Sequence, residues 1–229
     1  MTPPRSASPA ALGEALSGIA GFGPFFVLNT GPGQGEWRPV KEVYAAGLAH
    51  LVADRAACYG TGETRIAASI VQLGHAARLW SVMLGCAVAH GVVPDLSGLR
   101  QEAEGPSLRL AVPRGWHTPE DDALAPLLYR IVMDEHLVPL AAGLRVKVAA
   151  GLLHGNAASA LAEAARELVR ARPDLRQPAT DLARRLLDIG DLRGKGAFTG
   201  PDLSFRRRTC CLYYRVPGGG KCPDCCLAR

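Results

Sequence analysis

The sequence has no apolar run long enough to cross a membrane as a helix. Its most apolar stretch, Ile66 to Pro94, is interrupted by Arg78 and contains His75 and His90, whereas a spanning helix needs about 18 or more uninterrupted apolar residues. The first ten residues also lack the basic region, apolar run and cleavage site of a secretory signal. We therefore expect no transmembrane segment and a soluble protein of the cytoplasm.

Several motifs of common enzyme classes are missing as well. The phosphate-loop pattern does not occur, and Gly60-Thr-Gly62-Glu-Thr-Arg65 is a dinucleotide fingerprint without its third glycine. The six histidines show neither H-E-x-x-H nor H-x-H spacing. We expect no built-in nucleotide site. With 48% hydrophobic and 21% charged residues, the chain is expected to form a globular domain.

Most of the chain is expected to be helical, because apolar residues recur at spacings of three and four. This pattern predicts helices around 43–52, from Ile66 to near Gly91, from Asn156 to Arg172, and from about Thr180 to Ile189. A further helix is expected to begin at Thr118 and Pro119, followed by acidic residues at 120–122 that suit the positive end of a helix dipole.

Strand signals are few. Pro24 to Leu28 and Leu108 to Val112 are the two candidates, and a glycine-containing connection, Gly190 to Pro201, follows the last predicted helix. The expected fold is mainly α: a helical body with a small antiparallel β patch over residues 1–200, and a cysteine-rich segment, residues 201–229. That segment is too short for a core of its own, so we expect it to pack on the body.

Charge and sulfur both gather at the C-terminus. Phe205 to Arg229 holds six cations and one anion, which accounts for the whole net charge of +5, and it contains five of the seven cysteines. The odd number of cysteines and the expected reducing compartment favour metal or redox chemistry over disulfides. Cys58 and Cys86 lie far away, and each is interpreted as a small buried hydrophobe.

The spacing of the clustered cysteines points to a metal centre. Cys222 and Cys225 form a C-x-x-C pair, and ten residues separate it from the adjacent pair Cys210-Cys211. Adjacent side chains tend to diverge, which suits a core of two irons better than one tetrahedral zinc, so four thiolates on a 2Fe-2S core are favoured over a four-cysteine zinc site. Spacing alone leaves both open. Cys226 is left over, as a bystander or as a replacement for Cys225.

The neighbours of the cysteines favour the cluster. An oxidised 2Fe-2S core with four thiolates is dianionic, and nearby cations would offset that charge; these are Arg206, Arg207, Arg208, Arg215 and Lys221. The three glycines at 218–220 leave backbone amides free to approach inorganic sulfide.

The segment Arg206 to Leu227, with Arg-Arg-x-Cys-Cys-x-x-Tyr-Arg before Cys-x-Asp-Cys, resembles the C-terminus of the FhuF-like ferric siderophore reductases. The resemblance implies a 2Fe-2S cluster, held here by Cys210, Cys211, Cys222 and Cys225. The stretches 152–161 and 77–80 also look like segments of that family.

This resemblance implies a function. A 2Fe-2S cluster would reduce a ferric siderophore, of hydroxamate type, by one electron and release Fe(II), because the oxygen ligands hold Fe(III) far better than Fe(II). The electron would come from an external donor, such as an acidic ferredoxin-like protein attracted by the basic tail. The alternative is a zinc-stapled, non-enzymatic interaction or nucleic-acid-binding module. The net-neutral body argues against nucleic acid as a partner.

Contacts with the substrate are expected from Arg78, His154 and Asn156. A His-Gly-x-Asn stretch similar to His154-Gly155-Asn156 lies in the binding cleft of the related domain of siderophore synthetases. The competing interpretation is structural: Asn156 caps a helix and Gly155 allows the bend before it.

Overall fold

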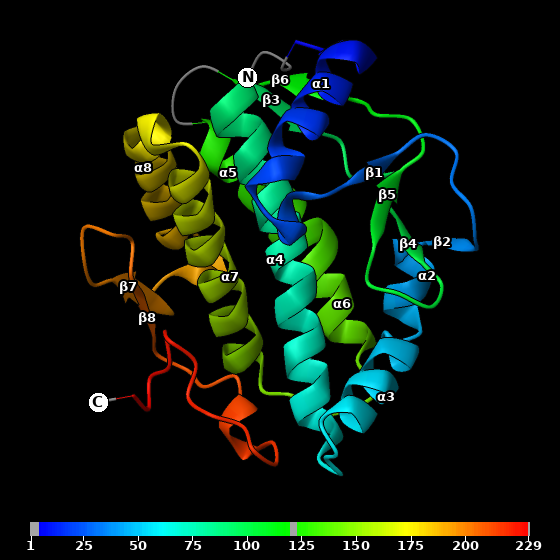
Figure 1. Ribbon diagram of the computed structural model, residues 1–229, viewed down its shortest axis with the longest axis vertical. Coiled ribbons are helices and arrows are strands. Elements are labelled where there is room, and N and C mark those ends of the chain that lie inside the picture. The colour runs from blue at the N-terminus through cyan, green and yellow to red at the C-terminus, as the bar shows by residue number, and fades with distance from the viewer. Residues whose placement is uncertain (1–4, 120–122, 229) are drawn as a thin grey trace.

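The computed structural model describes residues 5–119 and 123–228. Helices form most of it (Figure 1). The α-helices are α1 (Pro9–Ile19), α2 (Val40–Ala45), α3 (Ala49–Cys58), α4 (Thr64–His90), α5 (Leu124–Tyr129), α6 (Val138–Gly143), α7 (Ala150–Ala171) and α8 (Arg176–Leu187). A π-helix, Arg130–Leu137, joins α5 to α6 without a break. None of the described helices combines the length and apolarity needed to cross a membrane.

Short strands form three small sheets. The strands are β1 (Asn29–Thr30), β2 (Trp37–Pro39), β3 (Val92–Pro94), β4 (Arg100–Glu102), β5 (Leu108–Leu110), β6 (Gly115–His117), β7 (Gly196–Phe198) and β8 (Phe205–Arg207). Four of them are arranged in the order β1-β5-β4-β2, while β3 pairs with β6 and β7 with β8. All pairings are antiparallel except that of β1 with β5. The expected mainly α fold with small antiparallel sheets is confirmed.

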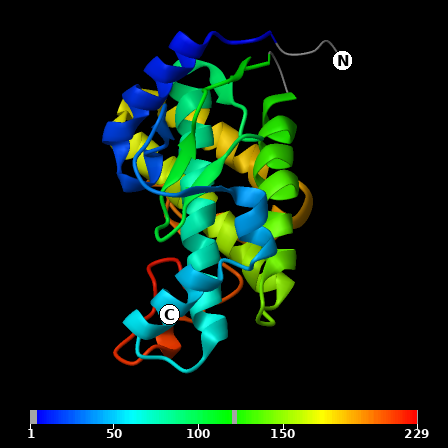
Figure 2. The same cartoon turned by 90° about the vertical axis from the view of Figure 1, so that its right-hand side faces the viewer.

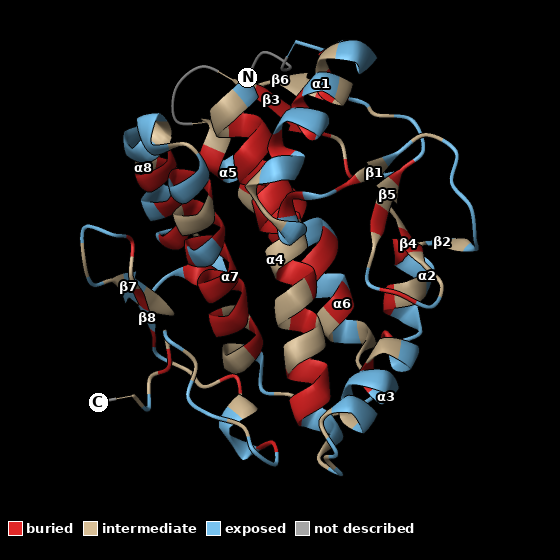
Figure 3. Cartoon of the chain, in the orientation of Figure 1, coloured by how far each residue is buried: buried red, intermediate tan, exposed pale blue. Residues whose placement is uncertain are grey.

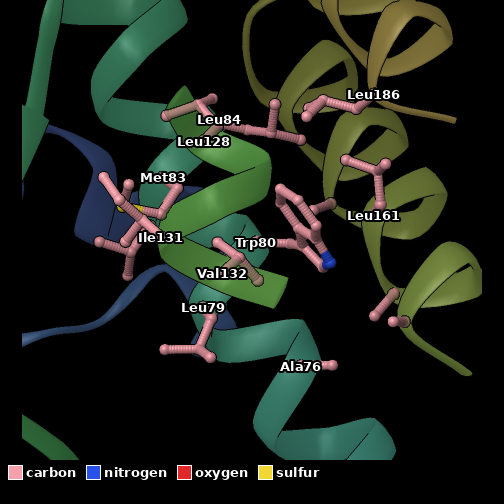
Figure 4. Close-up of a cluster of buried hydrophobic side chains, with 14 of the residues drawn as sticks. Ala76, Leu79, Trp80, Met83, Leu84, Leu128, Ile131, Val132, Leu161 and Leu186 are labelled. Atoms are coloured by element: carbon pink, nitrogen blue, oxygen red, sulfur yellow. The ribbon is translucent and has the colours of Figure 1, made fainter. Parts of the chain in front are cut away.

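The core lies between α4 and α7, which run side by side through the centre of the molecule (Figure 1, Figure 3). Trp80 of α4 is fully buried and points into the space between α4, α7 and the helix that begins at α5 (Figure 4). Leu161 of α7 and Leu186 of α8 flank it. Burial of such large side chains contributes about 1.5–3 kcal/mol each, so these helices form a rigid platform for the rest of the chain.

Two of the predicted segments have a different structure. The single helix predicted around 43–52 is broken into α2 and α3, because Gly47 (φ 73°) and Leu48 (φ 50°) adopt left-handed backbone conformations between them. Pro24–Phe26 forms a 3-10 turn, and the strand follows at Asn29. The predicted strand at Leu108 is confirmed as β5. The predicted helix start at Thr118 and Pro119 falls partly on residues 120–122, outside the described residues.

Three helix ends can be compared with their predictions. The long helix ends as predicted, with Gly91 (φ 64°) as its left-handed C-cap. By contrast, α7 begins at Ala150 rather than Asn156, so the N-cap interpretation of Asn156 is wrong. Similarly, α8 begins before Thr180, at Arg176. The glycine-containing connection after α8 is also more ordered than expected, since it contains β7.

A buried polar cluster lies on the side of α4 that faces α2 and the π-helix. The hydroxyl of Tyr44 lies 2.6 Å from His75 Nε2 and 3.0 Å from His136 Nδ1. Burial, together with the charges of His136 and Arg78, lowers the pKa of His75 from 6.5 to about 3. Burial lowers the pKa of His136 to about 4, helped by Lys41 and opposed by Asp95. Both imidazoles are therefore neutral at pH 7.

This cluster predicts an acid-sensitive fold. In the unfolded chain the two histidines take up protons below pH 6.5, whereas in the folded chain they resist protonation down to about pH 4 and about pH 3. The unfolding free energy should therefore fall as the pH drops below 6.5, by up to about 1.4 kcal/mol per pH unit for each histidine. Chemical denaturation between pH 7.5 and 4.5 measures this slope. His136→Gln should reduce the slope, while His50→Gln, on an exposed face of α3, should not; equal slopes in all three proteins would contradict the prediction.

Candidate metal centre

After β8, the cysteine segment runs along the end of the molecule where α4 begins (Figure 1, Figure 2). The ring of Tyr213 meets that of Tyr59 with centroids 5.6 Å apart, and Arg215 forms an ion pair with Glu63 at 2.6 Å. These two contacts join the segment to the start of α4 and the end of α3.

Turns bring the four cysteines close together. After Cys210 and Cys211, Leu212 takes a left-handed conformation (φ 72°) and opens the 3-10 turn Tyr213–Arg215. Cys222 and Cys225 share a tight turn in which the Cys225 amide donates to the Cys222 carbonyl at 3.0 Å. Cys211 and Cys225 are buried, while Cys210 and Cys222 are half-buried.

The other three cysteines differ in their exposure. Cys226 is half-buried. Cys58 is exposed, so its interpretation as a buried hydrophobe is wrong, whereas Cys86 is buried and its interpretation is confirmed.

The four thiols lie near one another. The Sγ atoms of Cys211 and Cys222 are 3.7 Å apart, and the thiol of Cys210 is close enough to those of Cys211 and Cys225 for both to affect it electrostatically. Among residues 5–119 and 123–228, no three His, Cys, Asp or Glu side chains form a group that could hold one metal ion. Four neighbouring thiols suit a 2Fe-2S core, which takes four cysteine ligands.

Without a metal, the thiols of Cys210 and Cys222 are protonated at pH 7. Burial raises the pKa of Cys210 to about 11, and the neighbouring Cys211 and Cys225 thiols add to the shift. Burial also raises the pKa of Cys222, although Arg207 opposes the shift. Backbone amides are already directed at sulfur: Leu212 N donates to Cys210 Sγ at 3.3 Å and Leu227 N to Cys225 Sγ at 3.4 Å. A bound metal would supply the positive charge that thiolates need here.

A buried ion pair joins two parts of the cysteine segment. Arg207 is 2% exposed and donates to both carboxylate oxygens of Asp224, at 2.7 and 3.0 Å. Its backbone amide also donates to the Asp224 carbonyl at 3.0 Å. Burial by itself would raise the pKa of Asp224, but hydrogen bonds and charge from Arg207 lower it, so the carboxylate stays ionised. The pair thus joins β8 directly to the turn that carries Cys222 and Cys225.

Asn156 connects this pair to the two central helices. Its Oδ1 accepts a hydrogen bond from Arg207 at 2.9 Å, and its Nδ2 donates to the backbone carbonyl and hydroxyl of Ser69 and to Gln72 Oε1. The Ser69 hydroxyl in turn donates to the Cys211 carbonyl at 2.9 Å, and Ser159 donates to Asp224. One fully buried amide therefore links α7, α4 and the cysteine segment.

The glycine beside Asn156 permits close packing. A Cβ atom on Gly155 would lie 1.9 Å from Thr209 Oγ1 and 3.2 Å from Thr209 Cβ. Because Thr209 immediately precedes Cys210, only glycine at position 155 lets the cysteine pair approach α7 this closely. The His-Gly-Asn stretch thus holds the segment in place instead of opening a helix.

The expected substrate-side residues are in different environments. Arg78 is half-buried on α4, and its guanidinium lies 5.2 Å from the Phe25 ring centre. His154 has its Nδ1 3.5 Å from Asp191 Oδ1. Asn156 is wholly enclosed by the hydrogen bonds described above. The structure does not bring the three side chains together, and their contact with a substrate stays a prediction.

Sequence reasoning missed the roles of Arg207 and Asp224. Arg207 had been grouped with the cations that offset the charge of a cluster, but it is buried and paired. Two signals could have identified it. In a strand, alternate residues share a face, which places Arg207 on the side of the buried Phe205. In addition, Asp224 is the one anion in a segment with six cations.

The ion pair generates a stability prediction. Asp224→Asn should destabilise the folded protein by about 3–5 kcal/mol, because it leaves the buried guanidinium of Arg207 uncompensated. The matched control is Asp174→Asn, because Arg172 also donates hydrogen bonds to both carboxylate oxygens of Asp174, but at an exposed site. Denaturant midpoints measure both effects. Similar small losses in the two variants would show that Arg207 and Asp224 do not act as a buried pair.

The close approach at Gly155 generates a second prediction. Gly155→Ala should displace Thr209 and loosen the cysteine segment, which limited proteolysis and hydrogen exchange of residues 205–228 would detect. Gly151→Ala is the control, because a Cβ there meets nothing within 4 Å on the same helix; it should leave the segment protected. Thr209→Ala combined with Gly155→Ala removes the nearest atom and should restore much of the protection. Full protection in Gly155→Ala alone would contradict the proposed packing.

Comparison with known proteins agrees with this geometry. Residues 207–227 match the family model described as the FhuF 2Fe-2S C-terminal domain, which confirms the resemblance found in the cysteine motif. No curated protein and no solved structure gives a match to the chain. The matched family implies a 2Fe-2S cluster as the cofactor. Over residues 207–227, which include all four clustered cysteines, the chain is similar to the FhuF 2Fe-2S C-terminal domain.

Proposed function

We propose that the protein is a ferric siderophore reductase that passes single electrons to an Fe(III) complex, of hydroxamate type, and so releases Fe(II). The observation that carries the proposal is the position of Cys222. Together with Pro223 and Asp224, it lines a cavity of about 450 Å³ between α4 and α7. A cysteine of the matched family segment therefore forms part of the wall of a cavity large enough to admit part of a small-molecule ligand.

The four expected ligands are Cys210, Cys211, Cys222 and Cys225, and a 2Fe-2S cluster bound to them would supply one-electron chemistry. The chain's own residues arrange the site. Arg207 and Asp224 fix the Cys222–Cys225 turn, and Ser69 holds the backbone at Cys211. The apolar residues Ile70, Leu73 and Phe205 exclude water from part of the cavity.

The proposed chemistry depends on ligand preference. Hydroxamate oxygens are hard ligands and hold Fe(III) more tightly than Fe(II), so one added electron weakens the complex. No proton or bond is exchanged in that step; the iron gains the electron, and an external ferredoxin-like protein loses one. Arg206, Arg208 and Lys221 are exposed on the segment and could attract an acidic donor. A location in the cytoplasm stays a prediction from the sequence.

The ligand assignment predicts different behaviour for two neighbouring cysteines. Cys222→Ser should abolish the visible absorption of anaerobically purified protein and the paramagnetic signal after reduction, because it removes one of four ligands. Cys226→Ser, the matched control from the same turn, should keep both. Equal loss in the two variants would show that the four-cysteine assignment is wrong.

Two measurements on the wild-type chain test the proposal itself. Metal and sulfide analysis should give iron and acid-labile sulfide in equal amounts; a colourless protein with one zinc and no sulfide would overturn it in favour of a zinc-stapled module. Reduced protein mixed with a ferric hydroxamate complex and an Fe(II)-specific chelator should then produce the chelator's colour.

A further inference from the structure

The cavity beside Cys222 contains more positive charge than its own carboxylates neutralise. Four arginines and two carboxylates line it. Arg166 pairs with Glu163 at 2.6 Å, and Arg207 pairs with Asp224. The remaining two arginines, Arg55 from α3 and Arg78 from α4, form no ion pair with any residue in the described part of the chain.

These two arginines lie near each other. Burial lowers the pKa of Arg78, and the charge of Arg55 lowers it further, so each guanidinium is close enough to repel the other. Arg78 donates to the Gly74 carbonyl at 2.9 Å and its guanidinium lies 5.2 Å from the Phe25 ring centre. That of Arg55 lies 5.3 Å from the ring centre of Tyr59. Neither contact neutralises charge. An anionic ligand in this partly apolar cavity would offset the repulsion between the two unpaired guanidinium groups and accept hydrogen bonds from them.

A smaller cavity of about 270 Å³ continues from the same place and shares Arg55 and Arg78 with the first. Its two carboxylates, Asp54 and Glu104, form no ion pair with either arginine in the described part of the chain. Asp54 lies 3.2 Å from His50, and among the described residues Glu104 forms no ion pair. The arginines therefore stand at the junction of the two cavities, where one ligand could reach both.

We infer that this site binds ferric complexes with a net negative charge, in which a free carboxylate of the siderophore is held by Arg55 and Arg78. Neutral and cationic complexes with the same iron-binding groups bind more weakly. The inference rests on the proposed function and adds the charge class of the substrate. It also has a consequence for the reaction: reduction makes the bound complex more negative by one unit, so the two cations stabilise the reduced complex more than the oxidised one.

The test uses three complexes with the same iron-binding groups and different net charges. One linear trihydroxamate is prepared with its terminal amine free, acetylated or succinylated, and each form is loaded with redox-inert Ga(III) to give net charges of about +1, 0 and −1 at pH 7. Calorimetry on the full-length protein should show the succinylated complex binding about tenfold to a hundredfold more tightly than the acetylated one, as expected for charge-assisted hydrogen bonds. The free amine should bind most weakly.

Variants assign the effect to the two arginines. Arg55→Gln, at an exposed position, and Arg78→Gln should each reduce the preference for the succinylated complex to about threefold or less. Arg78→Lys keeps the charge and should retain part of it. The matched control is Arg114→Gln, an exposed arginine just before β6, which should leave the preference unchanged. Thermal melting identifies any variant that fails to fold. If Arg78→Gln does not fold, the effect of Arg55→Gln on the preference for the succinylated complex decides whether the inference holds.

The outcomes separate this inference from the proposed function. Equal affinity for the three gallium complexes, or no binding of any, overturns the inference of an anion-selective site. If the three ferric counterparts are nevertheless reduced by the cluster-loaded protein at equal rates, the proposed function stands without charge selection. If the succinylated gallium complex binds as expected but no ferric complex is reduced, the result supports the anion-selective binding site and contradicts the proposed reductase function.

Discussion

The arrangement of the metal centre depends on the buried contact between Arg207, Asp224 and Asn156. A short segment rich in glycine and cysteine has too little apolar surface to fix its own conformation. Here a charge-assisted, two-bond contact joins β8 to the turn carrying Cys222 and Cys225, and the Asn156 amide ties the guanidinium to both central helices. In a low-dielectric environment such a network has few alternative arrangements, because any unmet partner costs its full desolvation. The helical body therefore determines where the thiols lie.

The same contact changes how the basic tail is understood. The sequence places the whole net charge of +5 around the cysteines, but the structure divides those cations into different roles. Arg207 forms an ion pair with Asp224, and Arg215 forms one with Glu63 of the body. Arg206 and Arg208 remain on the surface. The electrostatic field around the segment is thus weaker than the count of cations suggests, and part of the charge serves to anchor the segment.

Sequence reasoning identified the cysteine motif and the central helices, because both are periodic or spaced signals within a short window. The pattern from Ile66 to Gly91 could be predicted since a buried helix repeats every three to four residues. The site around it could not be predicted in the same way. Asn156 and Ser69 are 87 positions apart, and nothing local marks either as a partner of the other. The error at Asn156 shows why: its capping propensity is a local property, whereas its buried hydrogen bonds arise from tertiary packing that overrides propensity.

The position of the cavity follows from how α4 and α7 are spaced. Along their upper lengths Trp80, Leu161 and Leu186 fill the space between helices (Figure 4). The neighbouring cavity is lined by the small residues Gly74 and Ala77 on α4 and Ser159 and Ala160 on α7, together with the larger Ile70 and Leu73 of α4. Small residues at this level let the cysteine segment approach the helices and leave room for a ligand beside it. Cys222, Arg55 and Arg78 thus line one cavity between these helices and the cysteine segment.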